Sequence, residues 1–188
     1  ASLAYLALRQ KDATGLVTFD TKVRATVPAK SNQQQLTRIL ATLDSVGADG
    51  RTDLVSVVKE ISQGLPRRGL VVIISDLLGV DSLLDGLKML RQRGHDVAMF
   101  HVLHDHEIDF EFNGATRFEG LESEDFLNCN PRALREGYLA ALDEFLTSTK
   151  KACGRLSIDY LQVRTSEPLD AVLAKFLAAR QSLPKLKR

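Results

Sequence analysis

The stretch that decides the fold is Gly69-Leu-Val-Val-Ile-Ile-Ser75-Asp76. It is a run of apolar, mostly β-branched residues that ends abruptly on an acidic residue. A strand that is apolar on both faces is typical of the middle of a parallel sheet covered by helices. In such sheets ligands bind at the carboxyl ends of the strands, which is where Asp76 falls. We therefore expect an α/β fold with a binding edge at Asp76.

Strand and helix patterns alternate on both sides of this stretch. Residues 15–19 and 22–27 predict a hairpin whose second, more polar strand is the one antiparallel edge strand of the sheet. Residues 95–102 and 156–163 predict two further strands. Alternation with short connections predicts a doubly wound, mostly parallel sheet with helices on both faces, formed by a single domain over residues 1–188.

The helices predicted after the first hairpin carry apolar residues at helical spacing, which we expect to face the core. These inward residues are Leu36, Ile39, Leu40 and Leu43; Leu54, Val57, Val58 and Ile61; Leu83, Leu84, Leu87 and Leu90; Leu134, Tyr138, Leu142 and Phe145; and Leu169, Val172, Leu173, Phe176 and Leu177.

Residues 104–130 depart from the alternation of strand and helix patterns, because they are acidic, rich in turn residues and contain only short apolar patterns. Phe110, Phe112, Phe118 and Phe126 are spaced as in small strands. We interpret this segment as a small β-insertion.

The composition is that of a soluble globular protein, with 44% hydrophobic and 26% charged residues in 188 and a net charge of +1. Such a balance favours neither a nucleic acid nor a membrane surface as partner. The apolar run 70–74 is too short to span a bilayer, and no signal-peptide pattern opens the chain. Cys129 and Cys153 share no metal-ligand spacing, so we expect free thiols and a cytoplasmic location.

Several catalytic motifs are missing from the sequence. It contains no G-x-G-x-x-G, no G-x-x-x-x-G-K-[ST] and no G-x-S-x-G. These absences argue against a dinucleotide site, a P-loop ATPase and a serine hydrolase of the nucleophile-elbow type.

Two clusters have the chemistry of a metal site. Taken singly, Thr52 has the position of a helix N-cap, and Asp76 has the position of a carboxylate that caps a turn. Taken together, they bring two oxygen ligands for a hard cation to one edge of the sheet. The second cluster runs from His101 to Asp109 and has the side chains for zinc, but it lacks the helical i, i+4 spacing of known zinc motifs. We expect His101 within a strand, and His104 and His106 in an exposed loop.

The order of these elements resembles the von Willebrand factor A fold and, closely, the bacterial domain of unknown function 58 family. The resemblance extends over essentially the whole chain. It is carried by Tyr5–Asp20, by Gly50-Arg-Thr-Asp53, by Leu65–Leu77 and by Gly94–Leu103. Members of this family are linked to MoxR-type AAA+ ATPases, which the resemblance implies as partners.

In the family fold a metal-ion-dependent adhesion site uses a D-x-S-x-S motif, a threonine and an aspartate. The resemblance assigns Thr52 and Asp76 to the last two positions. The sequence contains no D-x-S-x-S, so we expect the chain to be incomplete at its N-terminus, without the central strand that carries the motif. Mg²⁺ or Mn²⁺ is then expected in the intact protein, and no metal binding by this chain alone.

The resemblance implies a non-enzymatic protein-interaction domain, an adaptor that binds an AAA+ ATPase or its client. One alternative is a doubly wound enzyme that uses Asp76 in Mg²⁺-dependent phosphoryl transfer, although no lysine follows the later strands. Another alternative is a structural module with a vestigial metal site.

Overall fold

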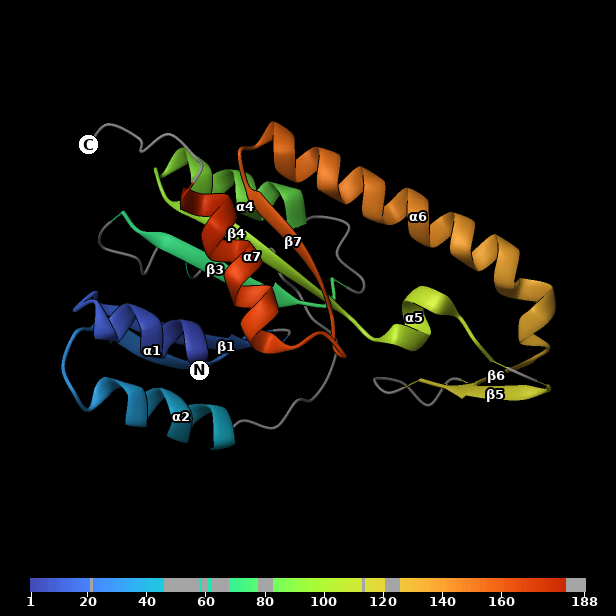
Figure 1. Ribbon diagram of the computed structural model, residues 1–188, viewed down its shortest axis with the longest axis horizontal. Helices are drawn as coiled ribbons and strands as arrows, with labels where there is room; N and C mark the ends of the chain where they lie inside the picture. Colours follow the sequence, from blue (N-terminus) through green and yellow to red (C-terminus); the bar gives the residue numbers. More distant parts are fainter. Residues whose placement is uncertain are drawn as a thin grey trace. The chain divides into compact units, whose positions relative to one another are not determined.

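The computed structural model describes residues 1–20, 22–45, 58, 61, 68–77, 83–112, 114–120 and 126–181 (Figure 1). The chain divides into two compact units. The first comprises Ala1–Arg68 and Leu78–Gly94, and the second comprises Gly69–Leu77 and His95–Arg188. The fold is mixed α/β, and the organisation as a single domain stays a prediction.

The first unit contains a hairpin and three named helices. Its elements are α1 (Ser2–Arg9), β1 (Thr14–Phe19), β2 (Val23–Lys30), α2 (Gln35–Ser45) and α4 (Leu83–Gln92). The predicted hairpin is confirmed, since β1 and β2 pair antiparallel. The register shifts around Gly15, where a Cβ atom would lie 2.7 Å from the carbonyl oxygen of Val27. Only glycine allows this close approach of the two strands.

Gln35 fastens α2 to the ends of the hairpin. Its side chain is completely buried, and its amide nitrogen donates to the carbonyl oxygens of Thr14 at 2.7 Å and Pro28 at 2.8 Å. Both acceptors lie at the outer end of the hairpin, where the strand ladder leaves carbonyl groups to be satisfied.

The second unit is built on a parallel sheet of β3 (Leu70–Ser75), β4 (Asp96–Leu103) and β7 (Asp159–Arg164), in that order. The predicted strands and their parallel pairing are confirmed. The central strand β4 is almost wholly buried, as its apolar sequence requires.

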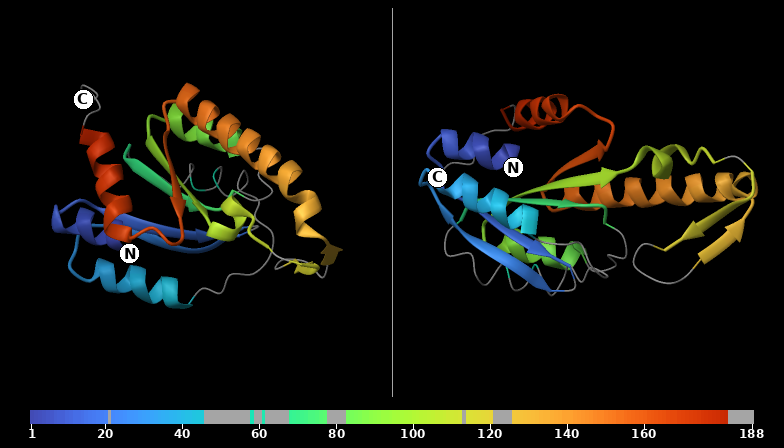
Figure 2. Two further views of the ribbon diagram at one scale, coloured as in Figure 1. Left: turned by 45° about the vertical axis from the view of Figure 1, so that its right-hand side comes forward. Right: turned by 90° about the horizontal axis from the view of Figure 1, so that it is seen from below.

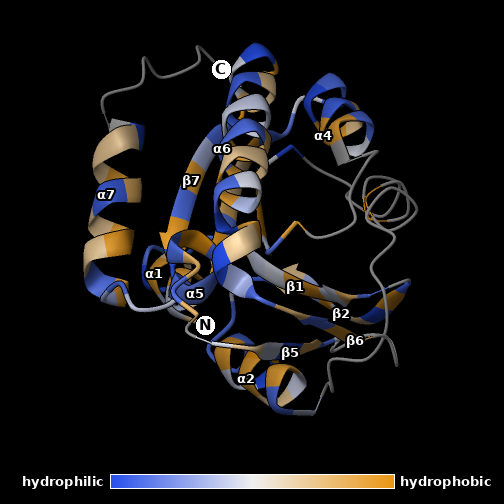
Figure 3. Cartoon of the chain, turned by 90° about the vertical axis from the view of Figure 1, so that its right-hand side faces the viewer, coloured by the Kyte–Doolittle hydropathy of each residue, from blue (hydrophilic) through white to orange (hydrophobic). Residues whose placement is uncertain are grey.

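Helices cover both faces of this three-stranded sheet. The ring of Phe100 lies 4.9 Å from that of Phe176 on α7 (Leu169–Gln181), whereas the ring of His101 lies 5.8 Å from that of Phe145 on α6 (Pro131–Arg155). Because successive side chains of a strand point to opposite faces, α7 and α6 lie on opposite sides of β4. Figure 3 shows that both helices carry polar as well as apolar residues.

The predicted β-insertion is confirmed as a second hairpin, β5 (Thr116–Glu119) paired antiparallel with β6 (Phe126–Cys129). It is preceded by a short helix, α5 (Asp105–Asp109), that the sequence did not predict. The hairpin lies beside the N-terminal end of α6 (Figure 2).

Two expectations about the sheet and helices need correction. Among the described residues β1 and β2 form a sheet of their own, so β2 is not the edge strand of the parallel sheet. Within the described ranges β1 and β3 do not pair with each other, since Val17 pairs with Thr26 and Val72 with Ala98. His104 and His106 are exposed as expected, but His104 is the N-cap of α5 and His106 lies within that helix, so they do not form a loop.

The predicted apolar stripes are only half buried, because each stripe is wider than the surface that covers it. Ile39, Leu87, Leu90, Val172 and Phe176 are buried as expected, and so is Val58. The predicted inward residues that are exposed instead are Leu40, Leu43, Leu84, Leu134, Phe145, Leu169 and Leu177. Leu54 and Val57 lie outside the described residues.

Candidate functional site

Asp76 lies at the carboxyl end of β3, in a strained turn. It is exposed, while the next residue, Leu77, is 2% exposed and has a φ angle of 59°. Leucine rarely adopts this left-handed conformation, which costs of order 1–3 kcal/mol and persists only where the surrounding structure enforces it. The Leu77 amide donates to the Ser75 hydroxyl at 3.1 Å, which closes the turn and presents Asp76 at the sheet edge.

A buried histidine on the neighbouring strand holds the backbone of this turn. His101 is completely buried, with Nε2 3.0 Å from the Asp76 carbonyl oxygen and Nδ1 2.7 Å from the Tyr160 hydroxyl. A carbonyl can only accept, so Nε2 carries the proton and Nδ1 accepts from the tyrosine. These partners fix a neutral tautomer and with it the position of Asp76.

The groups beneath the turn are all uncharged at neutral pH. Burial lowers the pKa of His101, and the Asp76 carbonyl and the nearby carboxylates only partly oppose this shift. Burial raises the pKa of Tyr160 to about 12 and that of Cys153 to about 11. A buried thiol with so high a pKa is a poor nucleophile, so Cys153 has a packing role.

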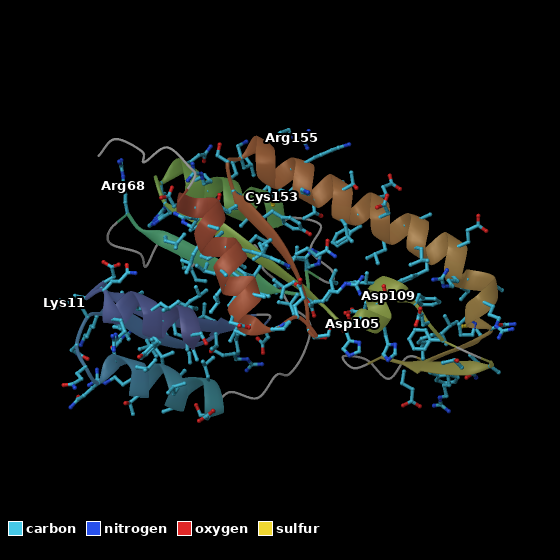
Figure 4. All side chains as sticks on the ribbon, viewed as in Figure 1. Lys11, Arg68, Asp105, Asp109, Cys153 and Arg155 are labelled. Atoms are coloured by element: carbon cyan, nitrogen blue, oxygen red, sulfur yellow. The ribbon has the colours of Figure 1, made fainter. Side chains whose placement is uncertain are left out.

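An ion-pair network joins α5, which follows β4, to the end of β7. The Arg164 guanidinium donates to both carboxylate oxygens of Asp109, at 2.7 and 3.0 Å, and to Asp105 at 3.2 Å. The Ser166 hydroxyl adds a bond of 2.9 Å to Asp105, and together with Arg164 it lowers the pKa of that carboxyl. Figure 4 shows Asp105 and Asp109 on α5, which the network fastens to the end of β7.

The described residues do not by themselves suit a magnesium ion. Over those parts of the chain, no three histidine, cysteine, aspartate or glutamate side chains converge to hold a metal. Asp76 contributes one carboxylate, and Thr52, the other predicted ligand, lies outside the described residues. Mg²⁺ requires near-octahedral oxygen coordination, which one carboxylate does not supply.

The predicted histidine cluster does not converge on one point. Both ring nitrogens of His101 are engaged inside the protein. His104 caps α5 instead, its Nδ1 accepting from the His106 amide at 3.1 Å while the Glu107 carboxylate accepts from the His104 amide at 2.6 Å. This reciprocal pattern is a capping box, with a histidine in the capping position.

Sequence reasoning missed the roles of His101 and Arg164. A histidine in an otherwise apolar strand gave a signal for His101, because a buried polar side chain needs partners. An arginine at the end of the last strand, with an acidic segment after the preceding strand, gave a signal for Arg164.

Comparison with protein families identifies a match over most of the chain. The family described as "Protein of unknown function DUF58" matches residues 1–145. Uncharacterized proteins from Mycobacterium bovis and Mycobacterium tuberculosis are each 27% identical over 161 residues, which is 82% of this chain and 50% of theirs. The chain thus spans about half the length of these curated relatives.

Two solved structures share the fold at 12% identity. The conserved hypothetical protein BatB from Bacteroides thetaiotaomicron has a TM-score of 0.53 and covers 96% of this chain and 86% of its own. An aerotolerance-related membrane protein from Bacteroides fragilis has a TM-score of 0.56 and covers 90% of this chain and 79% of its own. Within the described ranges here, no helix has the length and apolarity needed to cross a membrane.

Proposed function

This chain belongs to the DUF58 family, and from that premise we propose that it is a non-enzymatic domain that binds a partner protein through the turn at Asp76. The observation that carries the proposal is the construction of this turn. A strained backbone at Leu77 and a buried histidine together hold one exposed carboxylate at the carboxyl edge of a parallel sheet. Ligands of such sheets bind at that edge.

A MoxR-type AAA+ ATPase, or a client of that ATPase, is the partner we propose. The proposal includes the von Willebrand factor A-like, doubly wound architecture and a cytoplasmic location, where ATP is available to the partner. Support comes from the family membership and from the parallel sheet with helices on both faces.

The intact protein is proposed to use Mg²⁺ or Mn²⁺ at this edge, with Thr52 and Asp76 among the ligands. Because the described residues supply too few ligands, the remaining ones must come from elsewhere in the protein. When bound, the cation would supply an open coordination position for a carboxylate of the partner.

Binding of the ATPase to the intact protein tests the proposal. We expect Asp76→Ala to weaken binding about tenfold or more, equivalent to about 1.4 kcal/mol, without loss of thermal stability. Asp44→Ala is the matched control, since it removes an exposed carboxylate at the end of α2. Equal affinity of wild type and Asp76→Ala, with and without Mg²⁺, would show that this edge is not the binding site.

A separate experiment tests the alternative that Asp76 takes part in phosphoryl transfer. Incubation with acetyl phosphate followed by mass spectrometry is expected to leave Asp76 unmodified, because Arg164 and Thr165, and no lysine, stand at the carboxyl end of β7. A stoichiometric phosphoaspartate would contradict the proposal and favour an enzyme.

A further inference from the structure

The β5–β6 hairpin and the first turns of α6 expose a patch of apolar side chains, here called the hairpin surface (Figure 2). Its large side chains, Phe126, Leu127 and Leu134, are 57%, 55% and 43% exposed. Single exposed apolar residues are common on soluble proteins. These three lie close together, because Leu127 and Leu134 line the same pocket and Phe126 directly precedes Leu127. A patch of this kind is typical of an interface between proteins.

The hairpin surface includes an apolar pocket of about 500 Å³ between the hairpin and α6. Aromatic rings fix one of its walls, since the ring of Phe110 stacks on that of Tyr138 at 4.3 Å and faces that of Phe118 at 6.0 Å. Leu127 and Leu134 line the pocket and are also exposed. A molecule that covers these two leucines therefore removes both the patch and part of the pocket from water.

Strand β6 brings an unprotected edge to the hairpin surface. Among the residues that the structure describes, β5 and β6 form a sheet of two strands, so no strand pairs with the outer side of β6. Edge strands that stay single are commonly protected by charged residues or proline. β5 carries Arg117 and Glu119, whereas β6 reads Phe-Leu-Asn-Cys and carries neither a charge nor a proline. The edge of β6 can therefore accept a further strand.

The charges around the hairpin surface indicate which partner fits. Six exposed charged side chains directly adjoin residues that line the pocket, and they divide evenly into Arg117, Arg132 and Arg135 and Glu111, Glu119 and Glu136. An even mixture of signs attracts neither a strongly basic nor a strongly acidic partner, and it offers no excess of cations to an anionic membrane. A surface that meets its own copy across a two-fold axis needs both signs, because its arginines have to face its own glutamates.

We propose that the hairpin surface binds a second copy of this chain in a symmetric dimer. The two β6 strands pair antiparallel across the two-fold axis and join the two hairpins into one four-stranded sheet. The apolar patch of each copy is covered by the other, and the arginines of one copy face the glutamates of its partner. The turn at Asp76 takes no part in this interface, so the inference does not rest on the proposed function.

Sedimentation equilibrium of the intact protein tests the inference, and a reversible equilibrium between monomer and dimer is expected. Leu127→Lys places a charge on the edge strand and is expected to weaken dimerisation about tenfold or more. Leu169→Lys is the matched control, because it makes the same change at a leucine of α7 that is 58% exposed, and it is expected to leave dimerisation unchanged. Circular dichroism checks that both variants fold.

Charge reversal tests the contacts between arginines and glutamates of different copies. Arg117→Glu leaves only acidic charges on the two strands of the hairpin, and Glu119→Arg leaves only basic ones. Each variant alone is expected to dimerise about tenfold or more weakly than wild type, because like charges then meet across the axis. An equal mixture of the two variants is expected to recover the association as a heterodimer.

Any of three results would overturn the inference. The first is a protein that stays monomeric up to about 1 mM. The second is a dimer that Leu127→Lys weakens no more than Leu169→Lys does. The third is a monomer in which hydrogen exchange at residues 126–129 slows only when the ATPase is added, which would assign the hairpin surface to that partner. Asp76→Ala is expected to leave dimerisation unchanged, so failure of the dimer and failure of the proposed function can be distinguished.

Discussion

Asp76 keeps its position at the sheet edge because His101 stays neutral. The imidazole has to donate to the Asp76 carbonyl and accept from Tyr160 at the same time, and only the neutral ring does both. Protonation of His101 would place a charge in a buried site and turn its accepting nitrogen into a donor.

Stability is therefore expected to depend on pH through His101. Its pKa is lowered in the folded state, so the unfolded chain binds more protons below about 6.5, and the free energy of unfolding falls as the pH drops through that value. Denaturant titrations between about pH 7.5 and 5 check this. The non-titrating His101→Gln is expected to show a flatter dependence than wild type.

Identical pH dependence in His101→Gln and wild type would contradict the role given to His101. The carboxylates of Asp105 and Asp109 do not interfere in this range. Their pKa values are lowered from 3.8, so the stability they contribute is lost only as the pH falls below that value.

The sequence alone placed Asp76 correctly at the carboxyl end of a strand, because an apolar run that ends on an acidic residue has few other interpretations. It could not supply the partners of His101. Those partners come from residues 25 positions before it and 59 positions after it, and such pairings depend on the sheet order.

At the scale of elements, single polar side chains fasten helices to strands. Gln35 joins α2 to both strands of the first hairpin, and Arg164 joins α5 to β7. The Arg164 network is partly exposed, and exposed ion pairs contribute little to stability. Because Gln35 is completely buried, its hydrogen bonds are expected to contribute more to stability than the Arg164 ion pairs do.

Gln35→Leu is expected to lower the free energy of unfolding by about 1–3 kcal/mol. The change keeps a side chain of similar size but leaves two carbonyl oxygens without their donor. The neighbouring Gln34 is exposed, so Gln34→Leu is the control and is expected to alter stability by less than about 0.5 kcal/mol. Chemical denaturation measures both. If Gln35→Leu lost no more stability than Gln34→Leu, the hydrogen bonds of the Gln35 amide would not contribute to the free energy of unfolding.

Strands were easier to predict than buried helix faces. The parallel strands follow from short apolar runs separated by helical segments, and β3, β4 and β7 lie within a few residues of their predicted positions. An apolar stripe shows which side of a helix can be buried and not how much of it is covered. Leu169 and Leu177 flank the buried Val172 and Phe176 on α7, yet both are exposed.

At the scale of the whole molecule, two surfaces with different chemistry lie on the second unit. The turn at Asp76 presents a carboxylate whose backbone is held by His101, whereas an apolar pocket lined by Phe110, Phe118 and Tyr138 lies beside the β5–β6 hairpin. The first of them was predictable from the sequence. The pocket was not, because it arises where α5, β5, β6 and α6 meet.

The central claim is that the partner contacts the turn at Asp76. Hydrogen–deuterium exchange of the intact protein, with and without the ATPase and in the presence of Mg²⁺, tests it most directly. The account predicts slower exchange in the complex at the amides of Asp76 and Leu77, and loss of that protection in Asp76→Ala. Unchanged exchange at these amides, in a complex that protects other parts of the chain, would contradict it.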